Sequence, residues 1–159
     1  SRCIMRCNIL FVCSGNTCRS PMAAYLGAFI KEKQYPKSDF CFDSAGIATS
    51  DGYPATENAI AALAEWRIDC SGHRSKRFQS YMVDLADYII CMTAMHKAAL
   101  IHDYPEAAEK IFVIGELSGS GRDIPDPYMG SLELYCRTRD VLAEEIRMIL
   151  DKLAETKGF

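Results

Sequence analysis

Short apolar runs that alternate with helical patterns constrain the fold of this 159-residue chain more than any other feature. Such alternation is typical of an α/β fold, in which strands form a parallel sheet and helices return between them. The predicted strands are residues 8–12, 40–44, 87–92 and 110–114. The predicted helices are residues 21–33, 56–66, 94–101 and 132–154.

The last and the first of these helices have the clearest signals. In the last one, apolar residues recur at helical spacing, namely Leu142, Ile146, Ile149, Leu150 and Leu153. Ser131 is a suitable N-cap for it. For the first helix, Ser20 and Pro21 predict an N-cap followed by proline at the first helical position. Ligands of open parallel sheets bind beyond the carboxyl ends of the strands, so we expect residues 13–20 to carry the chemistry.

Length and net charge limit the number of domains and the kinds of partner that this chain can have. A chain of this length fits one domain, and we assign residues 1–159 to it, with irregular ends at 1–7 and 155–159. A net charge of -3 provides no electrostatic footprint for nucleic acid or an anionic membrane. No segment approaches the ~20 apolar residues of a membrane span. We therefore predict neither nucleic acid nor membrane as a partner; the sequence does not fix the oligomeric state, and we take a monomer as the working assumption.

The cysteines are predicted to be reduced thiols in a cytoplasmic protein. The chain has eight of them, at positions 3, 7, 13, 18, 41, 70, 91 and 136. The N-terminal segment does not have the pattern of a secretory signal, and Cys41 and Cys91 lie in strand-like apolar runs, where a thiol is a small hydrophobe. No C-x-x-C pair and no finger-like histidine spacing are present, so we predict no metal site.

The segment that follows the first strand carries a C-x5-R pattern from Cys13 to Arg19. A loop of this length can curl so that its N–H groups point at one oxyanion, and the next helix adds its positive end. Gly15 and Asn16 tolerate the left-handed backbone that such a curl requires. Arg19 can donate to two phosphate oxygens as a planar fork. The alternative interpretation is a buried thiol at a strand end and a solvated arginine.

The same positive field should favour the Cys13 thiolate, because helix N-termini and cationic neighbours lower a thiol pKa. The pattern therefore predicts that Cys13 is a nucleophile next to a phosphate-binding loop. The predicted loop consists of Ser14, Gly15, Asn16, Thr17, Cys18 and Arg19. It is not the nucleotide-binding loop, because the second glycine and the lysine of that motif are absent.

This segment resembles the low-molecular-weight protein tyrosine phosphatase family, whose pattern V-C-x-G-N-x-C-R-S-P is met by residues 12–21. Residues 43–46 resemble its D-S-A-G motif, His73 falls in its His-containing loop, and residues 126–128 resemble its D-P-[YF] loop. The resemblance covers nearly the whole chain. It implies a three-layer α/β fold, flavodoxin-like and phosphotyrosine phosphatase I-like, with a four-stranded parallel sheet flanked by helices. It also implies phosphorylated proteins as substrates, phosphate-like oxyanions as inhibitors, and no cofactor.

Departure of a substrate oxygen requires a general acid, since a phenolate with a pKa near ~10 is a poor leaving group. Asp126 is the candidate, between two prolines that limit the freedom of its loop. On the dipeptide alone, Asp-Pro could be only a turn. The resemblance implies that Asp126 protonates the leaving group and then activates the water that cleaves phosphocysteine on Cys13.

Other residues receive supporting roles from the resemblance. Ser20 could donate a hydrogen bond to the Cys13 sulfur, or act only as a helix cap. Ser44 and His73 resemble residues that brace the Asn16 side chain, although an isolated histidine is more often structural. Cys18 resembles a partner thiol that can form a reversible disulfide with Cys13. Its alternative interpretation is a small hydrophobe at the helix start.

Substrate choice is predicted to depend on Ser14, Thr17 and Tyr128. Eukaryotic members of the family that this chain resembles carry the pattern C-L-G-N-I-C-R. Bulky apolar residues stand there at the positions of Ser14 and Thr17. A bacterial branch that acts on phosphoarginine carries threonine at the position of Thr17, where a hydroxyl can orient water or bind the substrate. Phosphotyrosine is the family's named substrate, and phosphoarginine is the rival.

Two further functions compete with the phosphatase. An arsenate reductase on this fold needs additional thiols to relay a disulfide outward; Cys91 is near a suitable place, but position 98 is alanine and no paired cysteine follows. A catalytically inactive phosphate-binding module is disfavoured because nucleophile, arginine and acid occur together.

Overall fold

A computed structural model describes residues 6–158 of the chain. Its centre is a four-stranded sheet with the order β2-β1-β3-β4, and every neighbouring pair is parallel. The strands are β1 (Cys7–Cys13), β2 (Phe40–Gly46), β3 (Tyr88–Cys91) and β4 (Ile111–Val113). The helices are α1 (Arg19–Gln34), α2 (Glu57–Ala64), α3 (Ser80–Leu85), α4 (Ala94–Asp103), the 3-10 helix η1 (Pro105–Lys110), α5 (Ile114–Ser118) and α6 (Leu132–Lys157).

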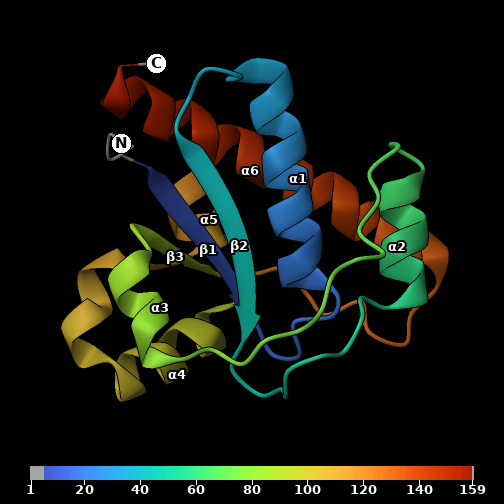
Figure 1. Cartoon of the computed structure of the whole chain (residues 1–159), viewed down its shortest axis with the longest axis horizontal. Helices are drawn as coiled ribbons and strands as arrows, with labels where there is room; N and C mark the ends of the chain where they lie inside the picture. Colours follow the sequence, from blue (N-terminus) through green and yellow to red (C-terminus); the bar gives the residue numbers. More distant parts are fainter. Residues whose placement is uncertain (1–5, 159) are drawn as a thin grey trace, which may run out of the picture.

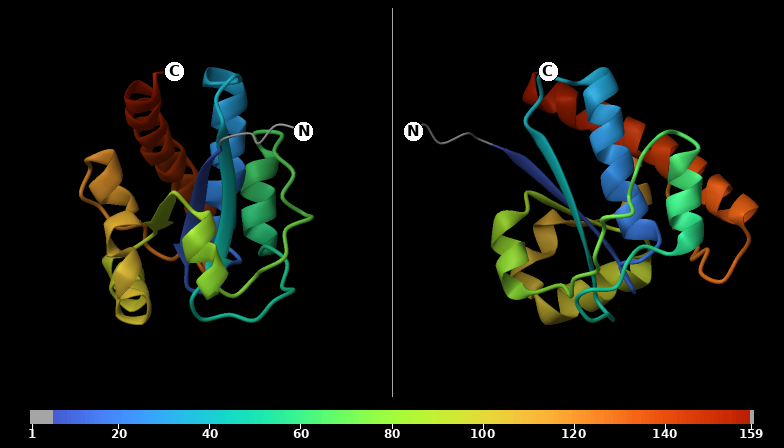
Figure 2. Two further views of the ribbon diagram at one scale, coloured as in Figure 1. Left: turned by 60° about the vertical axis from the view of Figure 1, so that its left-hand side comes forward. Right: turned by 45° about the vertical axis from the view of Figure 1, so that its right-hand side comes forward.

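Helices cover both faces of this sheet. On one face α1 and α6 pack side by side, with α2 beyond them, and on the other lie α3 and α4 (Figures 1 and 2). Strand β1 is apolar on both faces, as expected for a central parallel strand. Its Ile9 and Phe11 join the cluster under α1 and α6, while Leu10 and Val12 join the cluster under α3 and α4.

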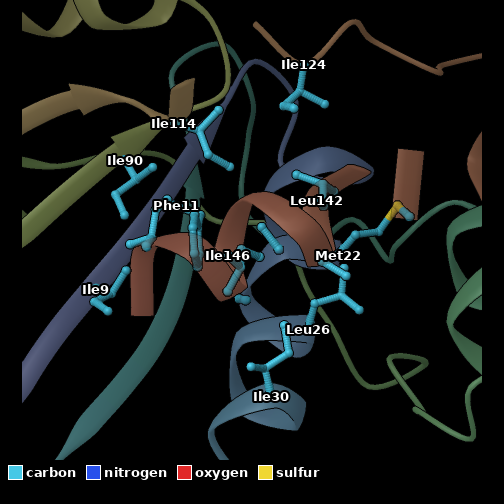
Figure 3. Packing of buried hydrophobic residues seen from close by; sticks show 14 of the residues in the cluster. Ile9, Phe11, Met22, Leu26, Ile30, Ile90, Ile114, Ile124, Leu142 and Ile146 are labelled. Carbon is cyan, nitrogen blue, oxygen red and sulfur yellow. The ribbon is translucent and has the colours of Figure 1, made fainter. Parts of the chain in front are cut away.

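The larger core is built from side chains at helical and strand spacing. Met22, Leu26 and Ile30 of α1 recur every fourth residue and are fully buried. Figure 3 shows them together with Ile9 and Phe11 of β1 and with Leu142 and Ile146 of α6. This packing holds the start of α1 against the end of β1, and thereby fixes the connection between them.

The predicted four-stranded parallel sheet flanked by helices is confirmed. All eight predicted elements are present, with boundaries shifted by up to three residues. Three short elements, α3, η1 and α5, were not predicted, because a helix of five or six residues is too short to display a repeating apolar stripe.

The start of α1 differs from the prediction. The helix begins at Arg19 and its N-cap residue is Cys18, so Ser20 and Pro21 lie inside the first turn. Proline is tolerated there because the first N–H groups of a helix have no intrahelical acceptor. The Ser131 cap of α6 was predicted correctly, since its Oγ accepts a hydrogen bond from Leu134 N.

The ends of the described chain are more regular than predicted. Helix α6 continues through Lys157, and Gly158 closes it with a left-handed backbone, so residues 155–157 are helical. Strand β1 already includes Cys7. The rest of the prediction, for residues 1–5 and 159, lies outside the described residues, as does Cys3. Within residues 6–158, no helix has the length and apolar character required to span a membrane.

Candidate active site

The loop of residues 14–18 connects β1 to α1 at the edge of the sheet toward which the β1 and β2 arrows point (Figure 1). Its carbonyl oxygens bond outward. Ile47 N donates to Cys13 O, Ala48 N to Ser14 O and Thr56 N to Thr17 O, each at 3.0 Å. Among the described residues, none of the loop's backbone N–H groups donates to a protein oxygen. Carbonyls that face outward and amides without oxygen acceptors are the arrangement of an anion-binding nest.

Asn16 holds this curl in place. Its φ of 56° is left-handed, as predicted for this residue, and its side chain is fully buried. The amide nitrogen Nδ2 donates to Ser20 Oγ at 2.8 Å and to Ser44 Oγ at 2.9 Å, while Oδ1 accepts from Lys76 N at 2.9 Å. Ser44 therefore meets the Asn16 side chain, as the resemblance implied.

His73 contacts Asn16 differently from the prediction. Its Nε2 lies 2.7 Å from the backbone carbonyl oxygen of Asn16 and does not reach the side chain. Because a carbonyl only accepts, Nε2 carries the proton and donates. Burial lowers the pKa of His73, which favours this neutral donor. A histidine on the 71–76 segment thus fixes another outward carbonyl of the loop.

The Cys13 sulfur lies 2.9 Å from Ser20 Oγ. Ser20 Oγ already accepts from Asn16, and its other contact, the Ala45 carbonyl oxygen, is 3.5 Å away. The Ser20 hydroxyl proton is therefore best directed at the sulfur. Ser20 combines this contact with a place in the first turn of α1, not with the predicted N-cap position.

The pKa of the Cys13 thiol is raised, whereas the sequence predicted stabilisation of the thiolate. Burial is the largest cause, because the residue is only 2% exposed and a buried sulfur loses its hydration. The hydrogen bond from Ser20, the charge of Arg19 and the backbone N–H of Asn16 all lower the pKa and so oppose this rise. The predicted stabilising contacts are thus present, and burial acts against them.

Arg19 connects the loop to the segment that carries Asp126. One guanidinium nitrogen donates to Ile124 O at 3.0 Å, and the other lies 3.5 Å from Asp126 Oδ2. The third nitrogen, Nε, is buried and has no hydrogen-bond partner among the described residues. Such an unpaired buried donor is costly, by about 1–3 kcal/mol, unless an acceptor reaches it. Asp126 Oδ1 accepts from Tyr128 N at 3.0 Å, which orients the carboxylate.

A cavity of about 600 Å³ opens over the loop. The predicted site residues that line it are Cys13, Ser14, Gly15, Asn16, Thr17, Cys18, Arg19, Asp126 and Tyr128. Ser20, Ser44 and His73 are buried behind the loop. Residues of the 48–57 segment, including Tyr53, Thr56 and Glu57, complete the wall and were not predicted. No motif identifies these residues, because the course of the chain after β2 is what brings them to the cavity wall.

Cys18, the predicted redox partner, is buried beside two hydroxyl groups. Its sulfur lies 3.3 Å from Tyr135 OH and 3.6 Å from Thr56 Oγ1, and those two oxygens are 3.3 Å apart. Burial raises the pKa of Tyr135 to about 12, so its phenol remains protonated. These contacts tie the end of the loop to α2 and α6.

His96 is a second histidine at the site that the sequence did not single out. It is buried on α4, with Nε2 2.9 Å from Ser14 Oγ and Nδ1 3.1 Å from Thr93 Oγ1. Burial, reinforced by the charge of Arg19, lowers the pKa of His96 to about 4. The available signal was Thr93 at a helix N-cap three residues earlier, directly after β3.

Among the described residues, no group of three or more histidine, cysteine, aspartate or glutamate side chains is placed to hold a metal ion. The seven cysteines of this part of the chain are free thiols. Cys13, Arg19 and Asp126 line the cavity together with the loop and supply a thiol, a guanidinium and a carboxylate.

Comparisons with known proteins found similar sequences and structures. The family model described as low molecular weight phosphotyrosine protein phosphatase matches residues 8–158. A protein-arginine-phosphatase from Geobacillus stearothermophilus is 39% identical over 148 residues, which cover 92% of this chain and 93% of that protein. The low molecular weight protein-tyrosine-phosphatase Ptp from Acinetobacter johnsonii is 38% identical over 131 residues, covering 82% of this chain and 87% of that protein.

A solved structure has the same fold. It is a cysteine-to-serine mutant of the YwlE arginine phosphatase with a phosphorylated active-site serine. It superposes with a TM-score of 0.87 at 35% identity, covering 92% of this chain and 95% of that one.

Proposed function

The chain belongs to the low molecular weight phosphotyrosine protein phosphatase family, and from this premise we propose which of its residues perform each step of the hydrolysis. Enzymes of this family are hydrolases that act on phosphorylated proteins through a phosphocysteine intermediate. The proposal treats residues 1–159 as one phosphatase domain. It places the protein in the cytoplasm, supported by the free thiols of the described cysteines.

One observation carries the proposal: the loop amides of residues 14–18 have no protein oxygen to bind, and buried Arg19 Nε has no partner among the described residues. A phosphoryl group supplies acceptor oxygens for both. The start of α1 adds its positive dipole end, which favours negative charge on the phosphoryl group and on the Cys13 sulfur. The loop thereby counteracts the effect of burial on the thiol.

In the first step the Cys13 thiolate attacks phosphorus. The S–P bond forms as the bond from phosphorus to the leaving oxygen or nitrogen breaks, and Asp126 transfers its proton to the leaving atom. In the second step Asp126, now a carboxylate, accepts a proton from water. The water oxygen bonds to phosphorus and the S–P bond breaks, with the Ser20 hydroxyl hydrogen-bonded to the departing sulfur.

Asn16, Ser44 and His73 keep the loop in the curl that both steps need. Cys18 is the redox partner in this proposal, since a disulfide with Cys13 would protect the nucleophile from further oxidation. Its hydrogen-bonded contacts with Tyr135 and Thr56 would then have to give way.

The experiment compares wild type with Cys13→Ser on an aryl phosphate. We expect a burst of phenol from wild type and no turnover by the variant, because a serine hydroxyl is a far weaker nucleophile. Phosphate or vanadate should still bind to the variant, since the amides and Arg19 remain. Full activity of Cys13→Ser contradicts the assignment of the nucleophile. Tight oxyanion binding without hydrolysis by wild type would identify a binding module instead.

Phosphoarginine is the substrate that we propose first. Ser14 and Thr17 both line the cavity, so its wall has two hydroxyl-bearing residues at positions where apolar residues would favour an aryl group. Phosphotyrosine is the second candidate, favoured by the exposed Tyr53 and Tyr128 on the cavity wall, which can stack on an aryl ring. Both substrates use the same nucleophile and acid.

Thr17→Ile separates these two candidates. Isoleucine removes the hydroxyl and adds an apolar surface, so the ratio of kcat/KM for phosphoarginine over phosphotyrosine peptides should fall in the variant. An unchanged ratio would remove Thr17 as a determinant of substrate choice.

A further inference from the structure

Glu57 is a wall residue of the cavity that none of the motifs explains. It is the first residue of α2, its side chain is exposed, and it makes no hydrogen bond or ion pair among the described residues. It lines the main cavity and also a smaller adjoining one of about 340 Å³. Acidic residues in the first turn interact favourably with the helix dipole, which explains a carboxylate on α2 but not its place in the wall.

The position of Glu57 relative to the phosphate-binding loop is fixed by its neighbour. The backbone N–H of Thr56 donates to Thr17 O at 3.0 Å, and the Thr56 hydroxyl caps α2 by accepting from Ala59 N. Thr56 Oγ1 is also within 3.6 Å of Cys18 Sγ. The carboxylate therefore projects from a backbone that is pinned directly to the loop.

The charges that line the main cavity are arranged with opposite signs. Arg19 and the start of α1 make the floor of the cavity positive. The two carboxylates of the lining are Glu57 and Asp126. A phosphorylated tyrosine carries only negative charge beside a neutral ring. A phosphorylated guanidinium carries negative charge on the phosphoryl group and positive charge on the carbon–nitrogen plane. The cavity is complementary to the second pattern.

Asp126 is already engaged, and this leaves Glu57 as the free carboxylate. One Asp126 oxygen faces Arg19 at 3.5 Å, and the other accepts from Tyr128 N. In the proposed mechanism Asp126 must also carry a proton in the first step. Tyr53 and Tyr128, which can stack on an aryl ring, can also stack on a guanidinium, so their presence is compatible with phosphoarginine.

We propose that Glu57 is a specificity-determining residue, which binds the guanidinium of phosphoarginine at the mouth of the cavity while the loop binds its phosphoryl group. This inference rests on the proposed function, because it names the substrate class of the same site. A carboxylate accepts from a guanidinium by charge-assisted hydrogen bonds, and it repels a substrate that is negative throughout.

The test measures kcat/KM for free phosphoarginine and for an aryl phosphate on wild type, Glu57→Gln and Glu57→Lys. For Glu57→Gln we expect a loss of about threefold to fivefold on phosphoarginine, the range of an exposed ion pair. The loss for Glu57→Lys should be on the order of tenfold. On the aryl phosphate the change should have the opposite sign, because removing a negative charge favours an anionic substrate. The matched control is Glu144→Gln, which replaces an exposed glutamate of α6 outside the lining of either cavity.

Several outcomes overturn the inference. Equal losses on both substrates would mean that Glu57 supports α2 or the loop; a lowered melting temperature would accompany them. A phosphotyrosine peptide with a flanking lysine is measured as a third substrate, and a loss confined to it would assign the carboxylate to a neighbouring substrate residue. No phosphoarginine hydrolysis by wild type, with normal aryl phosphate turnover, also rejects it and leaves the phosphatase intact. Failure of wild type on both substrates rejects the proposed function itself.

Raised salt provides a second readout. In wild type the preference for phosphoarginine over the aryl phosphate should decline as ionic strength rises, since exposed charges are screened. In Glu57→Gln this salt dependence should be weaker. An identical salt dependence in both proteins contradicts the inference.

Discussion

Ser14 Oγ and His96 Nε2 lie 2.9 Å apart and join the phosphate-binding loop to the start of α4. The Thr93 hydroxyl oxygen accepts from His96 N and contacts His96 Nδ1 at 3.1 Å. The Thr93 hydroxyl donates its proton to Nδ1, the acceptor within reach. Nδ1 is then unprotonated, and the ring proton of the neutral histidine lies on Nε2. His96 then donates to Ser14, and the Ser14 hydroxyl proton stays available to the cavity.

His96 should make the stability of the fold depend on pH. Burial lowers its pKa from 6.5 to about 4 in the folded chain. Between these values the unfolded chain binds a proton and the folded chain does not. The stability contributed above pH 6.5 is therefore lost as pH falls toward 4, by on the order of 3 kcal/mol in total. Urea unfolding of wild type and His96→Gln at pH 7 and at pH 4.5 measures this.

Glutamine at position 96 has no ionisable group and keeps a donor near Ser14, so the variant should lose less stability on acidification than wild type. His73, whose pKa is also lowered, is present in both proteins and cancels in the difference. Equal losses in the two proteins would show that His96 protonates in the folded chain as readily as in the unfolded one.

Gly46→Ala should disturb the loop through a direct clash. A Cβ on Gly46 would lie 2.6 Å from Ser14 O and 3.0 Å from Asn16 Cβ. The carbonyl belongs to the backbone and cannot move without the loop, so we expect about 1–3 kcal/mol of destabilisation and at least a tenfold loss of kcat/KM. Thermal unfolding and aryl phosphate turnover measure the two effects.

Gly72→Ala is the matched control, because a Cβ there would meet no atom of the described residues within 4 Å. This substitution should be neutral or stabilise the protein slightly. If Gly46→Ala behaved like the control, the close packing of β2 against the loop would not be needed for activity.

The phosphate-binding loop was predictable because its functional groups come from consecutive residues. Seven positions from Cys13 to Arg19 supply them, and the left-handed backbone occurs at an asparagine, a residue type that tolerates it. The first strand and the last helix were predictable for a similar reason, since the apolar run of β1 and the helical spacing of apolar residues in α6 each lie within one segment.

Other features depend on contacts between distant segments, for which a single sequence gives no spacing rule. His96 lies 82 positions from Ser14, and Glu57 enters the cavity wall only because Thr56 bonds to the loop. The predicted contact of His73 with the Asn16 side chain was wrong, because His73 contacts the Asn16 backbone carbonyl. A sequence does not distinguish these two kinds of contact. The raised pKa of Cys13 follows from the depth of burial, which the motif does not encode.

Ser44→Ala should loosen Asn16. The variant leaves Asn16 Nδ2 with Ser20 as its hydrogen-bond partner and removes a buried hydroxyl, at a cost of about 1 kcal/mol. The left-handed backbone of Asn16 then has less support, so kcat should fall more than the affinity for phosphate. Urea unfolding and steady-state kinetics test both expectations. Ser38→Ala is the control, because within residues 6–158 its hydroxyl bonds only to Tyr35 O.

Asp126→Asn should make the reaction more sensitive to the leaving group. The amide has a single oxygen, so it can keep the contact with Tyr128 N or the one with Arg19 but not both, and it cannot supply a proton. We expect kcat to fall by about 10²–10⁴ for aryl phosphates whose phenols have a high pKa, and by much less for those that leave readily as anions. A plot of log kcat against leaving-group pKa, for wild type and variant, measures the change in slope. The opposing interpretation is that Asp126 only orients Arg19 across their 3.5 Å contact. In that case every substrate would lose the same factor, the slope would not change, and phosphate would bind more weakly to the variant.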